Sequence, residues 1–387
     1  MVDDTYMHDA NYMAEAIRLA RRGLYTTSPN PRVGCVLVRD GKIIGRGWHQ
    51  WAGQAHAEIN ALRDAEKMHG NVRGATAYVT LEPCSHHGKT PPCCEALAAA
   101  GITRVVAAMQ DPNPLVSGRG LEFLRNAGIA TASGILENEA RELNPGFISR
   151  MTRNRPWVRV KLAMSVDGRT AMASGESQWL TGVAARSDVQ RLRARSCAVV
   201  SGVETVLQDN AALSVRANEL QLPEADEYPN VHEIAKRQPL RMVLDSKLRL
   251  HPPARIFAQP GRLVIATLND EQKRWEQIID GGGEIFHAPE DTGRIDLNAV
   301  MQYLTEQQCN EVLVEAGPTL AGAFWRAGLV DWLTIYMAPT LLGSKGKPLF
   351  DLPFDKMREQ QRLDIRDIRA IGNDWRIDAV PLKNDPA

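Results

Sequence analysis

Residues 80–94 read Thr-Leu-Glu-Pro-Cys-Ser-His-His-Gly-Lys-Thr-Pro-Pro-Cys-Cys, and His56-Ala57-Glu58 precedes them in the chain. Apolar spacing predicts one helix that begins directly after His56 and another that begins beside Cys93. The N-terminus of a helix carries partial positive charge, which lowers the pKa of a thiol and favours the thiolate, the form that binds metal. The two segments therefore predict an imidazole and a thiolate at helix starts, with Cys84 as a second thiol.

One imidazole and two thiolates supply three ligands for a tetrahedral Zn²⁺ and leave the fourth position for water, which is typical of a catalytic site. Cys93 and Cys94 compete for the last ligand position. Glu58 lies close enough to carry a proton from that water to a leaving amine. Zinc lowers the pKa of bound water from about 15.7 to about 7, and a placed carboxylate contributes roughly 10²–10⁴-fold more. A purely structural zinc remains an alternative.

The sequence around this motif alternates helix and strand. Apolar periodicity and glycine stops predict helices at residues 9–22, 57–68, 94–100 and 121–126. Strands are predicted at residues 33–39, 42–48, 75–80, 104–108 and 129–132, with Asp40-Gly41 as a hairpin turn between the first two. This order predicts three layers around one mixed sheet.

Residues 144–156 are rich in Asn, Pro, Gly and Arg, and we place a domain boundary near residue 154. A second alternating pattern follows over residues 155–387, in which the polar stretch 217–239 is predicted to be a surface loop. Strands are predicted at residues 158–163, 198–201, 241–245, 263–267, 311–314, 332–337, 363–368 and 375–380. Helices are predicted at residues 184–194, 271–280, 297–306 and 320–327.

The composition excludes several classes of protein. Lys and Arg total 46, Asp and Glu also total 46, and 44% of the 387 residues are hydrophobic, which argues against a disordered chain and a strongly basic nucleic-acid-binding surface. No apolar run approaches the roughly 20 residues of a membrane helix, and the acidic start has no signal-peptide character. Six cysteines are too sparse for a disulfide scaffold, so we expect a cytoplasmic protein with free thiols.

The His-x-Glu and Pro-Cys elements resemble zinc-dependent nucleobase deaminases. Members that act on nucleic acid carry Pro-Cys-x-x-Cys, whereas eight residues separate Cys84 from Cys93 here. The longer spacing, together with Ser-Pro-Asn-Pro-Arg-Val-Gly-Cys at residues 28–35, is similar to the deaminase domain of bifunctional riboflavin-biosynthesis enzymes. The resemblance implies a cytidine-deaminase-like three-layer α/β/α domain over residues 1–154.

In this resemblance His56, Cys84 and Cys93 are the zinc ligands and Glu58 is the catalytic residue. Cys94, one position further along the helix, is then expected to pack against other side chains. His86 and His87 are interpreted as loop residues that contact substrate phosphate or solvent, and Cys35 is interpreted as a core residue.

A second motif lies near the C-terminus, where a strand over residues 311–315 leads through Ala-Gly-Pro-Thr into a helix. Such a turn offers free backbone N–H groups to an anion, although a turn without a ligand fits equally well, and no GxGxxG fingerprint occurs. Residues 161–170, 175–181, 205–210 and 213–216 resemble the reductase domain of the same family. The resemblance implies a dihydrofolate-reductase-like α/β domain over residues 155–387 that uses NADPH.

The resemblance also implies the residues of the reductase site. NADPH would contact Ala163, Trp179, Thr205, Asp209, Ser246 and the turn of Gly317, Pro318, Thr319, Leu320, Ala321, Gly322 and Ala323. The substrate would contact Ser177, Arg193, Leu213, Arg216 and Glu315. Guanidinium groups bind oxyanions in a bidentate manner, which suits Arg193 and Arg216 to a phosphate. Taken alone, the two arginines also fit a solvated surface, and Trp179 also fits a core.

The resemblance covers nearly the whole chain and implies a bifunctional enzyme. Zinc-dependent hydrolytic deamination of 2,5-diamino-6-(5-phosphoribosylamino)pyrimidin-4-one would precede NADPH-dependent reduction of the ribose to ribityl. A homo-oligomer is implied, with phosphoribosylaminopyrimidines as partners and with neither nucleic acid nor membrane. Three alternatives stay open: a nucleic-acid (tRNA) deaminase with an appended non-catalytic module, a structural zinc domain joined to an interaction module, and an active deaminase with an inert reductase domain.

Overall fold

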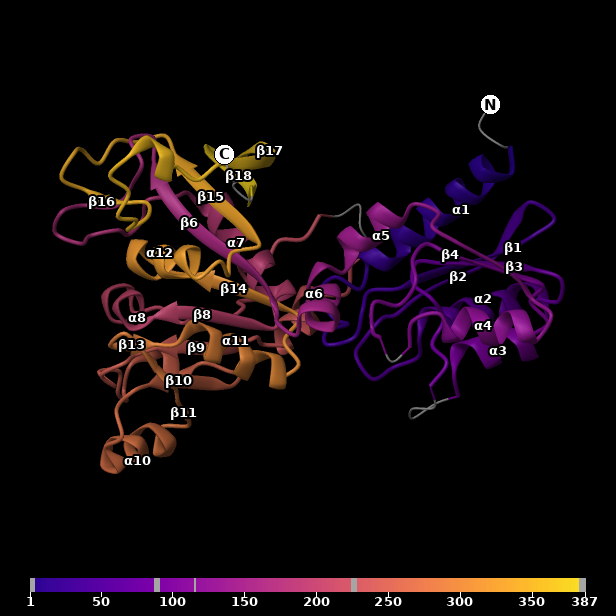
Figure 1. The fold of residues 1–387 in the computed structure, drawn as a ribbon, viewed down its shortest axis with the longest axis horizontal. Coiled ribbons are helices and arrows are strands. Elements are labelled where there is room, and N and C mark those ends of the chain that lie inside the picture. Colours follow the sequence, from indigo (N-terminus) through magenta and orange to yellow (C-terminus); the bar gives the residue numbers. More distant parts are fainter. Residues whose placement is uncertain (1–3, 87–90, 115, 224–227, 383–387) are drawn as a thin grey trace. The chain divides into compact units, whose positions relative to one another are not determined.

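The computed structural model describes residues 4–86, 91–114, 116–223 and 228–382 (Figure 1). The chain divides into two compact units, one containing residues 1–154 and 223–229 and the other containing residues 155–222 and 230–387. Within the described ranges, no helix combines the length and the apolar character that crossing a membrane requires.

The first unit is built on a five-stranded sheet with the order β2-β1-β3-β4-β5. Its strands are β1 (Gly34–Arg39), β2 (Lys42–Trp48), β3 (Thr76–Val79), β4 (Arg104–Ala107) and β5 (Ala130–Ser133). The pairs β1–β2 and β1–β3 are antiparallel, whereas β3–β4 and β4–β5 are parallel. The predicted mixed sheet is confirmed, and the carboxyl ends of β3 and β4 open at the same edge.

Helices cover both faces of this sheet, which confirms the three predicted layers. The helices are α1 (Asp4–Arg21), α2 (Ala57–His69), α3 (Cys93–Ala99), α4 (Arg119–Asn126), α5 (Glu137–Leu143) and α6 (Pro145–Arg153). Figure 1 shows α1 and α5 on one face and α2, α3 and α4 on the other. A β-carbon on Gly47 would lie 2.3 Å from the carbonyl oxygen of Ala57, so only glycine allows β2 to approach the start of α2 this closely.

Several segments differ from the sequence-based expectation, and two of them have a clear physical reason. The breaker-rich stretch before residue 154 contains the helix α6, because Pro145 occupies a first-turn position where a helix needs no N–H donor. The side chain of Asn144 is engaged by both the backbone N–H and the carbonyl of Arg32, which holds the start of α6. The prediction of a surface loop over residues 217–239 is wrong for α9 (Val231–Lys236), which Asn230 caps.

The second unit is built on a nine-stranded sheet with the order β11-β10-β9-β8-β14-β6-β15-β18-β17. Its strands are β6 (Trp157–Ser165), β8 (Ala198–Gly202), β9 (Leu240–Leu244), β10 (Leu263–Thr267), β11 (Glu284–His287), β14 (Glu311–Glu315), β15 (Trp332–Ala338), β17 (Leu363–Ile371) and β18 (Asp374–Pro381). The strands from β11 to β15 pair in parallel, and β18 and β17 add an antiparallel hairpin at one edge. Two short pairs also form, namely β7 (Arg169–Ala171) with β16 (Lys347–Pro348), and β12 (Glu290–Asp291) with β13 (Arg294–Ile295).

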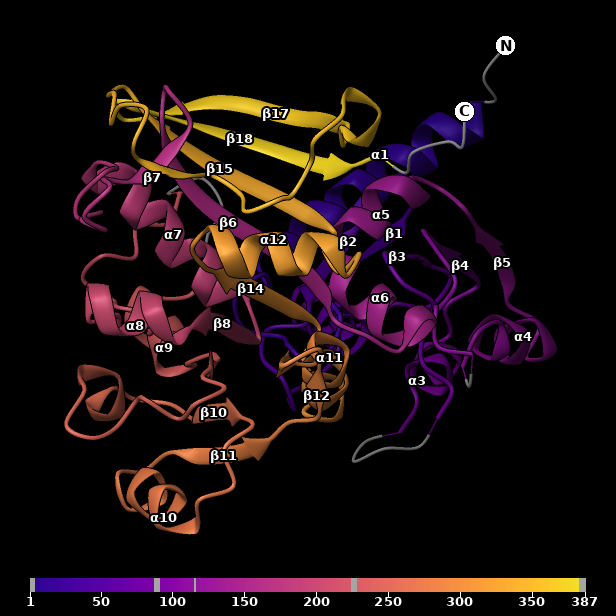
Figure 2. The same ribbon diagram turned by 60° about the vertical axis from the view of Figure 1, so that its left-hand side comes forward.

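Helices again cover both faces of the sheet, since the buried apolar residues form two clusters (Figure 2). Residues of α11 (Leu297–Glu306) and α12 (Pro318–Arg326) belong to one cluster. Residues of α7 (Val183–Arg195), α8 (Val203–Asp209) and α10 (Gln272–Asp280) belong to the other. Short 3-10 helices span Arg255–Ala258 and Met357–Glu359. The predicted α/β class is confirmed for both units.

Candidate active sites

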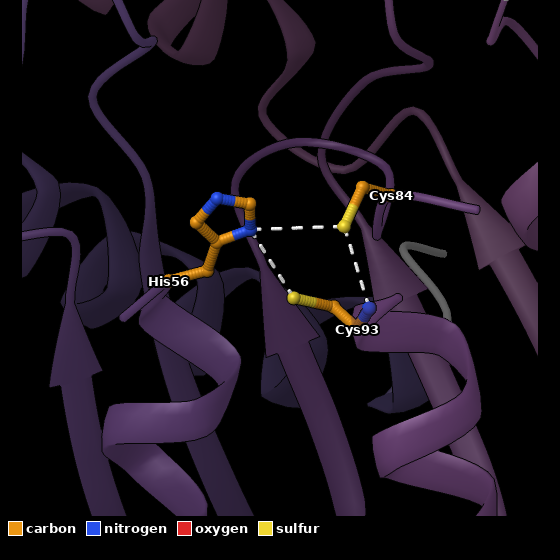
Figure 3. A group of neighbouring side chains, drawn as sticks. All are labelled: His56, Cys84 and Cys93. Atoms are coloured by element: carbon orange, nitrogen blue, oxygen red, sulfur yellow. Dashed lines mark hydrogen bonds between the residues drawn. The ribbon is translucent and has the colours of Figure 1, made fainter. Parts of the chain in front are cut away.

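Three side chains predicted to bind zinc converge in the first unit (Figure 3). His56 is the residue that precedes α2, Cys84 follows β3, and Cys93 is the first residue of α3. The Nδ1 atom of His56 lies 3.6 Å from the Sγ of Cys84 and 3.3 Å from the Sγ of Cys93. The backbone N–H of Cys93 donates to the Sγ of Cys84 at 3.3 Å. One nitrogen and two sulfurs all lie within 4.8 Å of one another, which suits a single tetrahedral ion.

The electrostatics of this group also fit a cation. Hydrogen bonding from Cys93 lowers the pKa of Cys84 to about 4, and the same contact raises the pKa of Cys93. The hydrogen bond with Cys84 raises the pKa of His56. Two adjacent thiols therefore ionise one at a time, and a divalent cation between them is what allows both to be thiolates.

Glu58 is 3% exposed and lies in the first turn of α2, two residues after His56. Burial raises the pKa of Glu58 to about 7, the charge of Cys84 adds to the rise, and His56 opposes it. The carboxyl group also forms a hydrogen bond with Cys93. A carboxyl group that titrates near neutrality beside a metal-binding group is suited to proton transfer.

The predicted packing positions of Cys94 and Cys35 are confirmed, whereas the role of the two loop histidines stays a prediction. Cys94 is buried in the core of the first unit, and Cys35 is buried within β1. His86 is exposed and does not belong to the three-residue group. His87 lies outside the described residues.

Two residues without a predicted role border the same site. His49 is buried, and its ring lies edge-on to that of His56 with 5.5 Å between the centroids. Burial lowers the pKa of His49, whose Nε2 lies 3.1 Å from the Nδ2 of Asn30. Asn30 belongs to the stretch 28–35 that carried the family resemblance, whereas a lone histidine after a strand gave no signal of its own.

In the second unit, two residues predicted to meet the substrate pair with each other. The Nε and Nη2 atoms of Arg193 donate to the two carboxylate oxygens of Glu315 at 2.6 and 3.0 Å. Arg216 forms an ion pair with Glu219, and its charge also acts on Glu315. Arg193 also donates to the backbone carbonyl of Ser214. The residue before it, Leu213, is 1% exposed. The structure thus groups the two arginines around one buried carboxylate.

Lys161 joins this group, although the sequence gave it no role. It lies on β6 directly opposite Glu315 of the parallel neighbour β14. Burial lowers the pKa of Lys161, and Glu315 opposes the shift. The register of two strands far apart in sequence places Lys161 beside Glu315, and residue spacing does not predict that register. The one available signal was that Lys161 belongs to residues 161–170, which resemble the reductase domain of the family.

Two further predicted residues, Ser177 and Trp179, lie in the loop before α7, and Ser177 contacts a third, Asp209 at the end of α8. The hydroxyl of Ser177 donates to Asp209 at 2.9 Å, and the side chain of Gln178 donates to the carbonyl of Asp209 at 2.9 Å. Trp179 is 71% exposed, with the guanidinium carbon of Arg186 4.8 Å from its ring centroid. The alternative that Trp179 is a core residue is therefore wrong.

The residues predicted to contact NADPH lie toward the carboxyl ends of four adjacent parallel strands. Ala163 is on β6, Gly317 follows β14, Thr205 is in the helix after β8, and Ser246 follows β9. Ligands of open α/β sheets bind at this edge.

The turn from Gly317 to Ala323 forms the start of α12, with Pro318 in the first turn. Apart from Gly317 itself and its two chain neighbours, no atom of the described residues lies within 4 Å of the point where a β-carbon on Gly317 would stand. The helix N-terminus is therefore open to the close approach of a phosphate, and the residues present fit a dinucleotide.

Comparisons with known proteins cover both units. A family model described as "RibD C-terminal domain" matches residues 156–377, and one described as "Cytidine and deoxycytidylate deaminase zinc-binding region" matches residues 7–109. The riboflavin biosynthesis protein RibD of Escherichia coli is 50% identical over 369 residues, covering 95% of this chain and 98% of that protein. RibD of Haemophilus influenzae is 44% identical over 374 residues, covering 96% and 97%.

Solved structures agree over the same length. RibD of Acinetobacter baumannii has a TM-score of 0.87 at 44% identity and covers 98% of this chain and 100% of that chain. A diaminohydroxyphosphoribosylaminopyrimidine deaminase/5-amino-6-(5-phosphoribosylamino)uracil reductase of Thermotoga maritima has a TM-score of 0.85 at 32% identity, with coverage of 98% and 100%. This chain therefore belongs to the RibD family, the bifunctional deaminase/reductases of riboflavin biosynthesis, which use zinc and NADPH.

Proposed function

We propose that residues 1–154 form the zinc-dependent pyrimidine deaminase domain of this enzyme and that residues 155–387 form its NADPH-dependent reductase domain. The proposed substrate of the first domain is 2,5-diamino-6-(5-phosphoribosylamino)pyrimidin-4-one. Its deaminated product would enter the second domain, where the ribose is reduced to ribityl. The name of the Thermotoga maritima relative, which spells out both reactions, supports this pair of substrates.

In the proposed deaminase site, His56, Cys84 and Cys93 hold the zinc ion. Zinc, when bound, supplies the Lewis acid that makes water nucleophilic at neutral pH. Glu58 accepts a proton from water and delivers it to the departing ammonia, as the carbon–nitrogen bond breaks and a carbon–oxygen bond forms. The convergence of the three ligand atoms with a buried carboxyl group beside them is the observation that carries this proposal.

In the proposed reductase site, the carboxyl ends of β6, β14, β8 and β9 bind NADPH through Ala163, Trp179, Thr205, Asp209, Ser246 and the turn from Gly317 to Ala323. The cofactor supplies the hydride that reduces the sugar. Arg193, Arg216, Glu315, Ser177 and Leu213 bind the phosphoribosyl substrate. Arg193, Arg216 and Lys161 all act on the carboxylate of Glu315, and the capacity of guanidinium groups to bind oxyanions supports the binding of a phosphate here.

We also propose that the enzyme is a homo-oligomer. Ile365 and Ile368 on the edge strand β17 are 55% and 52% exposed, and Trp375 on β18 is 45% exposed. Their partners in the hairpin register place all three on one face. The apolar face supports contact between two copies of this chain.

The proposed location is the cytoplasm. Cys35, Cys84, Cys93, Cys94 and Cys197 are thiols rather than halves of disulfides, and a reducing compartment keeps thiols in this state.

Zinc analysis combined with mass spectrometry of the pyrimidine product, with and without NADPH, tests the proposed function. We expect one zinc ion per chain, loss of one amine in the absence of NADPH, and a further gain of two hydrogens in its presence. Protein that contains zinc without releasing ammonia would indicate a structural ion. Release of ammonia without oxidation of NADPH would indicate an inert reductase domain, and deamination of RNA would revive the nucleic-acid alternative.

A further inference from the structure

Glu82, two residues before Cys84, accepts hydrogen bonds from four backbone N–H groups. Its side chain is 3% exposed. The oxygen Oε2 accepts hydrogen bonds from the backbone N–H groups of Asp111 at 3.1 Å and Gly118 at 2.9 Å. The oxygen Oε1 accepts from the N–H groups of Gly120 at 2.8 Å and Leu121 at 3.3 Å. One buried carboxylate thus binds the segment that leads into α4 and the first turn of that helix.

This set of donors needs a side chain with two acceptor oxygens. An ionised carboxylate offers about four lone-pair sites and no donor, so Glu82 satisfies four N–H groups at once. Glutamine has the same shape, but its amide nitrogen is a donor and would face two of these N–H groups. A buried donor left without an acceptor is costly, and at least the two backbone N–H groups that face the amide would be left so.

The turn that carries Cys84 is held from both sides. On one side, the backbone N–H of Cys93 donates to the Sγ of Cys84, and the N–H of Cys94 donates to its carbonyl. On the other side, the start of α4 approaches so closely that a β-carbon on Gly120 would lie 2.0 Å from the carbonyl oxygen of Pro83. Glu82 supplies the hydrogen bonds that keep α4 in this place, and Pro83 transmits the position to Cys84.

We propose that Glu82 is a positioning residue of the deaminase site, which sets the place of the Cys84 sulfur relative to His56 and Cys93 and so tunes the affinity for zinc. The inference rests on the proposed function, because it takes these three residues as the ligands. Groups that orient metal ligands from outside the coordination sphere typically change metal affinity or activity by 10–100-fold when they are altered. Glu82 would orient Cys84 through the backbone of Pro83 and would not itself be a ligand.

The test measures the zinc dissociation constant of metal-free full-length protein by competition with a chromogenic chelator, for wild type, Glu82→Gln and Glu82→Asp. We expect Glu82→Gln to raise the dissociation constant by about 10–100-fold. Glu82→Asp keeps the charge but is shorter, and we expect an intermediate value. NADPH oxidation with the deaminated substrate should stay at the wild-type rate in both variants, since Glu82 lies outside that unit.

Asp9→Asn is the matched control, because Asp9 is another buried carboxylate of the same unit whose partners are Arg104 and Tyr78. It should lower the melting temperature of that unit and leave the zinc dissociation constant unchanged. An unchanged constant in both Glu82 variants, or an equal weakening in Asp9→Asn, would overturn the role of Glu82. Wild-type protein that binds no zinc would instead overturn the proposed function, so the two failures are distinguishable.

Discussion

Arg193 and Glu315 form a bidentate ion pair between residues 122 positions apart in the chain, with side chains only 11% and 9% exposed. The pair links α7 to the carboxyl end of β14. Burial raises the pKa of Glu315, but the charge and hydrogen bonds of Arg193 lower it more, so the carboxylate is ionised. Lys161 and Arg216 act on the same carboxylate. Glu315 is thus the anchor of a cationic group at the proposed sugar-phosphate site.

Replacement of Glu315 by glutamine should damage both stability and reduction. Loss of one partner of a buried ion pair typically costs about 3–5 kcal/mol, because the other charge stays buried. Because the pKa of Glu315 is lower in the folded state, its ionised carboxylate contributes its full stabilisation above about pH 4.5. This contribution is lost as the pH falls through the pKa of the folded state. Thermal unfolding between pH 3 and pH 7 and the rate of NADPH oxidation measure the two effects. Ammonia release serves as the control, and a variant with wild-type KM for the reductase substrate would contradict the assignment.

Replacement of Glu58 by glutamine should separate catalysis from metal binding. The amide cannot accept the proton from water, so we expect ammonia release to fall by roughly 10²–10⁴-fold. Zinc content should stay at the wild-type level, because His56, Cys84 and Cys93 are intact. Ammonia release is measured on protein of known zinc content. Activity within a factor of two of wild type would exclude Glu58 as the proton carrier.

Cys84 and Cys94 make a matched pair of substitutions, since both are thiols of the same unit and only one faces His56. Cys84→Ala should abolish stoichiometric zinc and ammonia release. Cys94→Ala should keep both and lower stability by about 1–2 kcal/mol through lost packing. Elemental analysis and thermal unfolding are the measurements. Retention of zinc by Cys84→Ala would show that the ion is bound elsewhere.

Acid sensitivity of the first unit should depend on Asp9. Hydrogen bonds from Arg104, at 2.8 and 2.6 Å, lower the pKa of Asp9 below its usual 3.8, against the effect of burial. The ionised carboxylate of Asp9 therefore contributes its full stabilisation above about pH 4. That contribution disappears as the pH falls through the pKa of Asp9 in the folded state. Asp9→Asn should cost about 1–3 kcal/mol at pH 7 and should flatten the loss of stability toward acid pH. An unfolding curve with the wild-type pH dependence would argue against this pair.

The exposed face of the β17–β18 hairpin should control the oligomeric state. Ile368→Asp places a charge on that face without touching either proposed active site. We expect sedimentation velocity to show a shift toward the monomer, while zinc content stays unchanged. Arg358→Ala, an exposed substitution in the short 3-10 helix, is the control and should keep the wild-type sedimentation coefficient. A monomeric wild-type protein would refute the proposed homo-oligomer.

The local elements and the residues proposed to bind zinc follow from short-range patterns. The hairpin turn at Asp40-Gly41, the helix that starts after His56 and the helix that starts at Cys93 depend on neighbouring residues, and the structure has all three. The helix α6 was missed because Asn-Pro-Gly composition suggests a break, whereas Pro145 is compatible with a first turn.

What the sequence by itself determined was the class of chemistry: a histidine and a cysteine at helix starts, a second cysteine after a strand, a glutamate two residues after the histidine, and the family of both halves. What only the tertiary structure decided was which distant side chains complete each site. Strand register places Lys161 opposite Glu315, and the approach of α4 to Pro83 brings four N–H groups to Glu82. The physical reason is that hydrogen-bond partners and ion pairs across a sheet depend on how whole elements pack, and residue spacing along the chain carries no record of that packing.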